Sequence, residues 1–169
     1  EVMINQVRGV LEKNRSAEKT LLASLKDDYI IRAKTVSYIL EHHPGAEYNI
    51  DELNIIAELM GIDEIHIFDE NGTIYAGTIP KYYGYSFDSG EQIGYFMPML
   101  GDKNLSMCQD VTPNTAEERN MMYAIVWSSL GDKMIQVGIE PLRLIDELKN
   151  NQISNVIDSI PVYEDIKIY

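Results

Sequence analysis

The stretch that most restricts the fold runs from Asp63 to Gly77, DEIHIFDENGTIYAG. Ile65 and Ile67 alternate with polar neighbours, which is the period-two pattern of a strand that is buried on one face. The dipeptide Asn71-Gly72 is typical of tight hairpin turns, because glycine adopts a positive φ without strain and asparagine tolerates one. The apolar residues that follow read as the return strand. We therefore expect a β-hairpin here.

The segment before the hairpin has the spacing of one long helix. From Met3 to Leu40, apolar side chains recur at steps of three and four residues, the pattern of an amphipathic helix. The first part narrows to a coiled-coil seam that contains Asn14, and asparagine at a seam position can fix register and oligomeric state. Pro44-Gly45 ends the helix. Forty residues of helix span about 60 Å, so we expect the first turns to project and to form a homodimer interface.

The rest of the chain divides into shorter elements around one loop-rich segment. Residues 78–105 are rich in glycine, proline and aromatic residues, so we expect loops that cap a ligand site, with one short helix at 91–100. The other predicted helices are 51–60, capped by Asn49 or Asp51, and 141–150, which residues 152–160 extend. The predicted strands are 107–111, 121–129 and 134–139, and residues 162–169 begin another.

Composition and charge exclude several classes of function. The chain has 169 residues, of which 45% are hydrophobic and 24% charged, which is typical of one globular domain. Its net charge of −13 argues against nucleic-acid binding, which uses clustered Lys and Arg, and against docking to an anionic membrane by charge alone. The sequence contains no apolar run of about 18 residues that would span a bilayer. A single cysteine, Cys108, excludes an internal disulfide and a Cys-rich zinc site.

The predicted strands sort into two faces with different chemistry. Alternation places Ile65 and Ile67 on an aliphatic face suited to packing against the long helix. The opposite face mixes aromatic rings, amides and glycine, which is the composition of a small-molecule pocket. The ligand-binding residues predicted on this face are His66, Tyr75, Gln109, Tyr123, Trp127 and Gln136, with Tyr82, Tyr83, Tyr85 and Phe87 as the lid. The alternative is that these aromatic residues form a second core without a ligand.

Metal binding finds little support in the sequence. His42 and His43 are adjacent at a helix end, where neighbouring side chains point in different directions. The segment that starts at Asp69 begins like a calcium loop, but its glycine falls too early and Pro80 occupies the position of the final bidentate glutamate. We therefore predict no metal and no cofactor.

Catalytic motifs are also lacking. The sequence contains no nucleophile elbow, phosphate loop or dinucleotide fingerprint. The one nucleophile–base pair that can be assembled is His66 with Cys108 or Ser106, which would serve a small hydrolase or lyase. We predict no catalytic residue and a non-enzymatic role.

The order of these segments resembles the Cache (PAS-like, PDC) extracytoplasmic sensor domains of bacterial transmembrane receptors. The residues that carry the resemblance are GIDEIHIFDENGTIYAGT after the two helices, then YYGYSFDSG, CQDVTPNTAE and YAIVWSS, and a closing strand that ends in QVGIEP. The sensor regions of diguanylate cyclases and histidine kinases of Firmicutes type are the nearest likeness. Residues 1–160 would then form one module that begins with helix 1–43, and the tail 161–169 would start a second module of a longer protein.

The resemblance implies an α+β fold: a five-stranded antiparallel sheet with the long N-terminal helix on one face and a loop and short-helix cap on the other. It implies a pocket for amino acids, carboxylates, amines, purines or similar metabolites. It also implies output through transmembrane helices outside this chain, as in two-component or c-di-GMP signalling. The alternative is a ligand-free structural or dimerisation module of such a receptor.

One departure from the family bears on the ligand. The amino-acid binders of the family carry an Arg-x-Trp motif, whereas here Ile125 stands two residues before Trp127. Lys81 and Arg119 remain as nearby cations that could meet a ligand carboxylate.

Overall fold

The structure is a computed structural model that describes residues 2–159. The described residues divide into two units: residues 23–141 form one, and residues 2–22 and 142–159 belong to the other. The first unit holds the sheet and the site described below. The predicted start of a second module, 161–169, and the predicted strand 162–169 lie outside the described residues.

The N-terminal elements form where the sequence predicts them. Helix α1 (Val2–His42) is continuous, and Pro44 starts the short 3₁₀ helix η1 (Pro44–Tyr48) directly after it. Helix α2 (Ile50–Met60) begins after Asn49, whose side chain accepts a hydrogen bond from the Glu52 backbone N–H at 3.2 Å. Asn49 is therefore the N-cap of α2. Gly61 ends the helix in the left-handed conformation that favours glycine.

The sheet is antiparallel, and five strands pair in the order β2-β1-β6-β5-β3. The first hairpin turns at Gly72, whose φ is +82° and whose N–H donates to the Asp69 carbonyl at 3.0 Å. The last strand that the structure describes, β6, lies in the centre between β1 and β5. The strands are β1 (Glu64–Asp69), β2 (Ile74–Gly77), β3 (Ser106–Cys108), β5 (Asn120–Trp127) and β6 (Lys133–Ile139), and a short β4 (Thr112–Pro113) also pairs with β5.

Two predicted elements are broken into pieces. The strand expected at 107–111 ends at Cys108 with β3, because the chain bends at residues 109–111, where the Thr112 hydroxyl donates to the Asp110 carbonyl at 2.7 Å; β4 begins only at Thr112. The helix expected at 91–100 is α3 (Glu91–Gly94) followed by the 3₁₀ helix η3 (Met97–Gly101). Pro98 accounts for this break, since it lacks an N–H and its ring clashes with the preceding turn of a continuous helix. Helix α4 (Pro141–Ser159) includes the predicted extension 152–160 as far as Ser159, and residue 160 lies outside the described residues.

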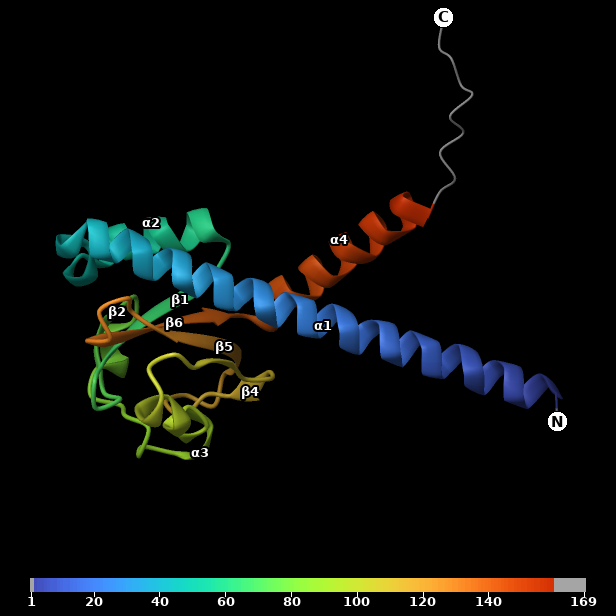
Figure 1. Cartoon of the computed structure of the whole chain (residues 1–169), viewed down its shortest axis with the longest axis horizontal. Helices are drawn as coiled ribbons and strands as arrows, with labels where there is room; N and C mark the ends of the chain where they lie inside the picture. The colour runs from blue at the N-terminus through green and yellow to red at the C-terminus, as the bar shows by residue number, and fades with distance from the viewer. Residues whose placement is uncertain (1, 160–169) are drawn as a thin grey trace, which may run out of the picture. The chain divides into compact units, whose positions relative to one another are not determined.

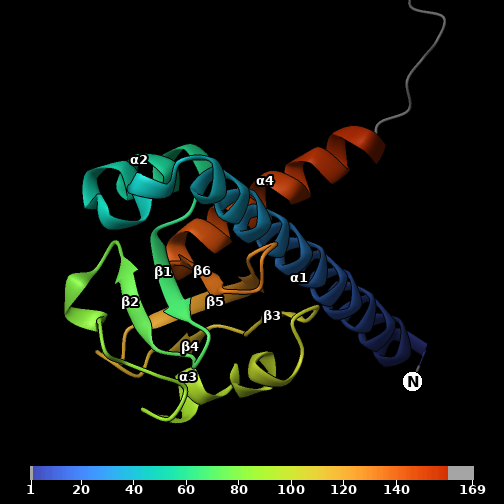
Figure 2. The ribbon, with the colours of Figure 1, turned by 60° about the vertical axis from the view of Figure 1, so that its left-hand side comes forward.

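The two faces of the sheet carry different covers. Figures 1 and 2 show residues 23–42 of α1, together with α2, on one face of the sheet, and α3 with its flanking loops on the other. The α1 side chains buried on this side keep the predicted helical spacing: Leu25, Tyr29, Ala33, Val36 and Leu40. Arg32 ties the two helices together by donating to the Met60 and Gly61 carbonyls.

The opposite face of the sheet packs against a second core. We call residues 78–105 the cap; it contains the 3₁₀ helix η2 (Pro80–Tyr82), α3 and η3. Side chains of the cap interleave with those of β1, β2, β5 and β6. The buried members are Phe68, Ile74, Tyr82, Phe87, Ile93, Phe96, Met99, Met121, Tyr123, Ile125, Trp127 and Met134. The fold is thus the predicted α+β arrangement, with the long helix on one side and the cap on the other.

Candidate functional site

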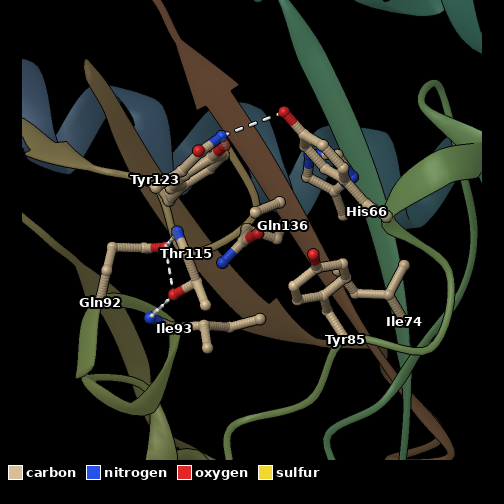
Figure 3. Close-up of a pocket in the computed structure, with 11 residues that line it drawn as sticks. His66, Ile74, Tyr85, Gln92, Ile93, Thr115, Tyr123 and Gln136 are labelled. Atoms are coloured by element: carbon tan, nitrogen blue, oxygen red, sulfur yellow. Dashed lines mark hydrogen bonds between the residues drawn. The ribbon is translucent and has the colours of Figure 1, made fainter. Parts of the chain in front are cut away.

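A small cavity lies between the sheet and the cap (Figure 3). Its volume is about 20 Å³, which is room for about one water molecule. Strands β1, β2, β5 and β6 form one wall, and the cap and a loop at residues 114–119, which we call the return loop, form the other. The lining residues are His66, Ile74, Tyr82, Tyr85, Gln92, Ile93, Asn114, Thr115, Ala116, Tyr123 and Gln136.

The register of the sheet brings the strand residues of the wall together. His66 of β1 pairs with Gln136 of β6, and Tyr123 of β5 pairs with Gly138. Directly paired residues share a face, so His66, Gln136 and Tyr123 all point to the capped side. A Cβ at position 138 would lie 2.7 Å from Cε1 of Tyr123. Glycine at this position therefore leaves the space in which the Tyr123 ring lies across the sheet.

A buried carboxylate supports the wall from behind. Glu64 at the start of β1 is 2% exposed; one of its oxygens accepts a hydrogen bond from the Tyr123 hydroxyl at 3.0 Å and lies 2.7 Å from Nε2 of His66. The other oxygen forms an ion pair with Arg119. Burial alone raises the pKa of Glu64, but the hydrogen bond and charge of His66, the charge of Arg119 and the Tyr123 hydroxyl outweigh it and hold the pKa below its usual value. Glu64 is therefore ionised.

Arg119 connects the return loop to this carboxylate. Its guanidinium also donates to Glu140 and to the Tyr82 hydroxyl, both at 3.3 Å. The Tyr82 hydroxyl in turn donates to Glu117, and Lys81 pairs with the same carboxylate. The two cations that the sequence offered for a ligand carboxylate are thus both paired with protein carboxylates, and neither lines the cavity.

Asn114 organises the return loop itself. Its side-chain oxygen accepts hydrogen bonds from the backbone N–H groups of Glu117 and Arg119, at 2.9 and 3.2 Å. Its side-chain nitrogen donates to the hydroxyls of Tyr82 and Tyr123 at 3.1 and 3.3 Å. Burial and the charge of Glu64 raise the pKa of Tyr123, so its hydroxyl stays protonated and acts as a donor to Glu64.

The cap is tied to the return loop through a second carboxamide. The side-chain oxygen of Gln92 accepts from the backbone N–H and the hydroxyl of Thr115, at 2.9 and 3.2 Å. The side-chain nitrogen of Gln92 donates to the side-chain oxygen of Gln109 at 3.0 Å. Gln109, which the sequence placed in the pocket, lies behind the wall instead and fixes the orientation of Gln92.

Two buried nitrogen atoms of the wall have no hydrogen-bond partner among the described residues. They are Nε2 of Gln136 and Nδ1 of His66, in side chains that are 3% and 1% exposed. Figure 3 shows the Gln136 carboxamide directed into the space between Ile93 and Tyr85. An unpaired buried polar group costs about 1–3 kcal/mol, and most such groups in proteins are paired. The wall therefore presents hydrogen-bonding groups that are free for a bound molecule.

Five of the residues predicted from the sequence meet at the cavity: His66, Tyr82, Tyr85, Tyr123 and Gln136. Tyr75 does not join them. The pairing of β1 with β2 steps from Ala76 to Ile74 and skips Tyr75, which is a β-bulge. Ile74 takes the cavity position, and the Tyr75 hydroxyl donates instead to Glu47 in η1 at 3.0 Å.

The remaining predicted residues lie near the cavity but not on its wall. Trp127 is on the expected face, yet its indole N–H donates to the Met99 carbonyl at 2.8 Å, within the core under the cap. Phe87 packs against Phe68 with ring centroids 5.1 Å apart. The Tyr83 hydroxyl donates to the Gly77 carbonyl at 3.1 Å, at the surface.

Sequence reasoning missed part of the wall because it comes from irregular backbone. Gln92 and Ile93 belong to a single helical turn, and Asn114, Thr115 and Ala116 belong to the return loop. Asparagine at 114 is a typical turn-former, which indicates a turn there but not its place against the sheet.

The nucleophile–base pair considered from the sequence is not assembled. Cys108 and Ser106 pair with Ala124 and Val126 of β5, so they share the face that is covered by α1, whereas His66 lies on the capped face. Burial raises the pKa of the Cys108 thiol to about 12, so the thiol is protonated and a poor nucleophile.

Among the side chains that the structure describes, no group of three or more His, Cys, Asp or Glu residues is placed to hold a metal ion. Among the helices that the structure describes, none is both long and apolar enough to cross a membrane.

The fold is similar to solved structures of bacterial signalling proteins. The Bacillus subtilis YkuI protein, which has an EAL domain and was crystallised with c-di-GMP and calcium, matches with a TM-score of 0.57 at 12% identity. The match covers 80% of this chain and 37% of that one. The sensor domain of the Vibrio cholerae histidine kinase DctB matches with a TM-score of 0.50 at 11% identity, over 86% of this chain and 61% of that one.

The fold is that of the Cache (PDC) sensor domains. This confirms the fold predicted from the sequence. The chain spans less than two thirds of either structure. No family model and no curated protein matches the chain.

Proposed function

We propose that the chain is the extracytoplasmic ligand-sensing domain of a bacterial transmembrane signalling receptor, and that the cavity receives a small metabolite. The observation that carries the proposal is the capped wall of the sheet, where buried nitrogen atoms of Gln136 and His66 have no hydrogen-bond partner among the described residues. Buried groups without partners weaken a fold, and a site that needs them for binding accounts for their presence. The similarity in fold to sensor domains supports the same role.

Signalling starts when a ligand moves the cap or the return loop. A cavity of about 20 Å³ holds no metabolite unless the cap or the return loop shifts. Arg119 links the return loop to Glu64 of β1, and the other face of β1 packs toward α1. A shift of the return loop therefore displaces β1 against α1, and α1 carries the displacement along its length toward transmembrane helices outside this chain.

A thermal-shift screen against amino acids, carboxylates, amines, purines and sugars tests ligand binding. A ligand that binds the native state raises the unfolding midpoint, and the rise grows with ligand concentration. Tyr85→Ala, which alters the cavity wall, is expected to reduce the rise. Tyr83→Ala is the matched control, because Tyr83 lies outside the wall. A ligand whose effect survives Tyr85→Ala unchanged would bind elsewhere and contradict the proposed site.

The second candidate function is a ligand-free structural or dimerisation module. The small cavity volume favours it, because aromatic rings already fill most of the space under the cap. When no compound in the screen raises the unfolding midpoint, native mass spectrometry of the purified domain distinguishes the ligand sensor from the ligand-free module. A protein that carries a small molecule from its host supports the sensor, and an empty protein supports the module.

We further propose that the receptor dimerises through the N-terminal part of α1. Met3 and Val7 of the predicted seam are 74% and 57% exposed, and apolar side chains at such spacing are typical of coiled-coil contacts. Val7→Asp is expected to convert a dimer to a monomer in sedimentation velocity, whereas Arg8→Asp, one residue off the seam, leaves the dimer intact. Equal behaviour of the two variants would argue against the seam.

A further inference from the structure

The cavity wall is almost free of charge. Of its eleven lining residues, none is Asp, Glu, Lys or Arg, and His66 is the one cationic candidate among them. Glu64 and Arg119 lie behind the wall and pair with each other, and Glu117, which accepts a hydrogen bond from the Tyr82 hydroxyl, pairs with Lys81. A charged molecule that entered this space would lose its hydration without gaining a free counter-charge, which is strongly unfavourable.

Most polar groups of the wall are already engaged within the protein. Gln92 uses its oxygen on Thr115 and its nitrogen on Gln109. Asn114 uses both ends of its side chain, and the hydroxyls of Tyr82 and Tyr123 donate to carboxylates. A free donor that points into the cavity is Nε2 of Gln136 (Figure 3). A complementary ligand therefore offers a hydrogen-bond acceptor at this point.

Flat side chains surround that donor. The rings of His66 and Tyr82 have centroids 5.3 Å apart, those of His66 and Tyr123 5.9 Å, and those of Tyr82 and Tyr85 6.3 Å. Ile74 and Ile93 close the sides. Aromatic faces favour stacking with a planar partner, so the site suits a flat molecule that enters as Tyr85 and the cap move outward.

We infer that the cavity binds a small, uncharged, planar ring compound that presents a carbonyl oxygen or ring nitrogen to the Gln136 carboxamide. The inference rests on the proposed function and narrows it to one chemical class, to the exclusion of free carboxylates and amines. It selects Gln136 as the residue that recognises the ligand, and the rings around it as the surfaces that select for shape.

Three ring compounds of nearly the same shape test the role of charge. Benzamide is neutral, benzoate is an anion and benzamidine is a cation at pH 7. We expect benzamide to raise the unfolding midpoint with increasing concentration, and the two charged compounds to have no effect over the same range. In calorimetric titration, Gln136→Leu is expected to weaken benzamide binding at least tenfold, while Tyr83→Ala leaves it unchanged. Gln136→Asn, which keeps a shortened carboxamide, serves if the leucine variant does not fold.

Each outcome bears on the inference separately from the proposed function. Binding of benzoate or benzamidine as strong as that of benzamide overturns the inference, as does benzamide binding that Gln136→Leu leaves intact. A metabolite screen that yields only charged ligands also overturns it but leaves the sensor function standing. If neither the three probes nor any metabolite binds, and native mass spectrometry finds no small molecule on the purified protein, both proposals fail. Binding of an uncharged ring metabolite that requires Gln136 supports both proposals, even if benzamide itself does not bind.

Discussion

The two faces of the sheet are formed by the same strands, but one is aliphatic and the other carries polar and aromatic side chains. On the side of α1, residues such as Ile65, Ile67 and Val137 are fully buried and purely aliphatic. On the capped side, alternate residues of the same strands are His66, Gln136 and Tyr123, set in a network of hydrogen bonds and ion pairs. Apolar burial contributes about 25 cal/mol per Å² without directional requirements, whereas every buried polar group needs a partner.

The difference shows where stability and binding are separated in this fold. The face toward α1 is packed with fully buried aliphatic side chains. The capped face breaks one rule at a defined point, because Gln136 and His66 keep unpaired nitrogens in a buried wall. Natural sequences violate such rules mainly at functional sites. The comparison therefore predicts that mutations on one face change the free energy of unfolding, and mutations on the other change binding.

The largest expected effect is on the face toward α1. Ile67→Ala removes a fully buried side chain, and such changes lower the free energy of unfolding by about 2–5 kcal/mol. Ile74→Ala is the matched change on the capped face, and its loss is expected to be smaller because Ile74 already borders a cavity. Urea unfolding of both variants measures the difference, and equal losses would remove the contrast between the faces.

A pH series tests the buried carboxylate. The folded-state pKa of Glu64 lies below its usual value, so its stabilising contribution is complete above about pH 4.3, the ordinary pKa of glutamate, and is lost as the pH falls through the folded value. Glu64→Gln is expected to lower the free energy of unfolding by about 1–3 kcal/mol at pH 7 and to flatten its decline in acid. Glu70→Gln, at an exposed turn position, is the control and leaves the wild-type profile.

Substitution of two glutamines on the capped side compares the stability contribution of a side-chain amide that is hydrogen-bonded with that of one that is not. Gln136→Leu removes a buried nitrogen that lacks a partner, so the free energy of unfolding is expected to rise by about 1 kcal/mol. Gln109→Leu strands the nitrogen of Gln92 and is expected to lower it by a similar amount. Thermal and urea unfolding measure the sign of the change in the free energy of unfolding for both variants. A loss of stability in Gln136→Leu would show that this amide is paired in solution.

The smallest effect is expected at Cys108. Its thiol has a pKa of about 12 because of burial, so the native protein is expected to react with iodoacetamide at pH 8 far more slowly than the unfolded protein. Cys108→Ala is expected to leave any ligand-induced rise of the midpoint unchanged, because Cys108 lies on the face toward α1. Loss of ligand binding in this variant would show that the face toward α1 also affects the ligand site, which would contradict the division of stability and binding between the two faces.

Regular alternation made the faces predictable, and irregular backbone set the limit. The period-two pattern placed His66, Tyr123 and Gln136 on one face, and the ladder confirms their register. Tyr75 was misplaced because a bulge in β2 shifts the parity, and no residue type in that strand marks the bulge. A pattern of faces also carries no information on distance from the cavity, so Trp127 was assigned to the correct face but lies under Met99.

The loop contribution to the wall was beyond reach for a different reason. Asn114 and Gln92 act through hydrogen bonds to residues that are distant in sequence, such as Tyr123 and Gln109. Helical and strand periodicity report local conformation only. Contacts of this kind depend on how the finished sheet places the loops, and one sequence alone does not encode them in a periodic signal.

The central place of β6 has a consequence for how the chain folds. Strand β1 forms its hairpin with β2, which follows it closely in the sequence, but its other edge pairs with β6, which lies more than 60 residues further along the chain. Closing that long loop costs chain entropy before any pairing repays it. One edge of the hairpin of β1 and β2 therefore stays unpaired until β6 is in place. The chain is expected to fold in milliseconds to seconds, in one cooperative step, once β6 inserts between β1 and β5.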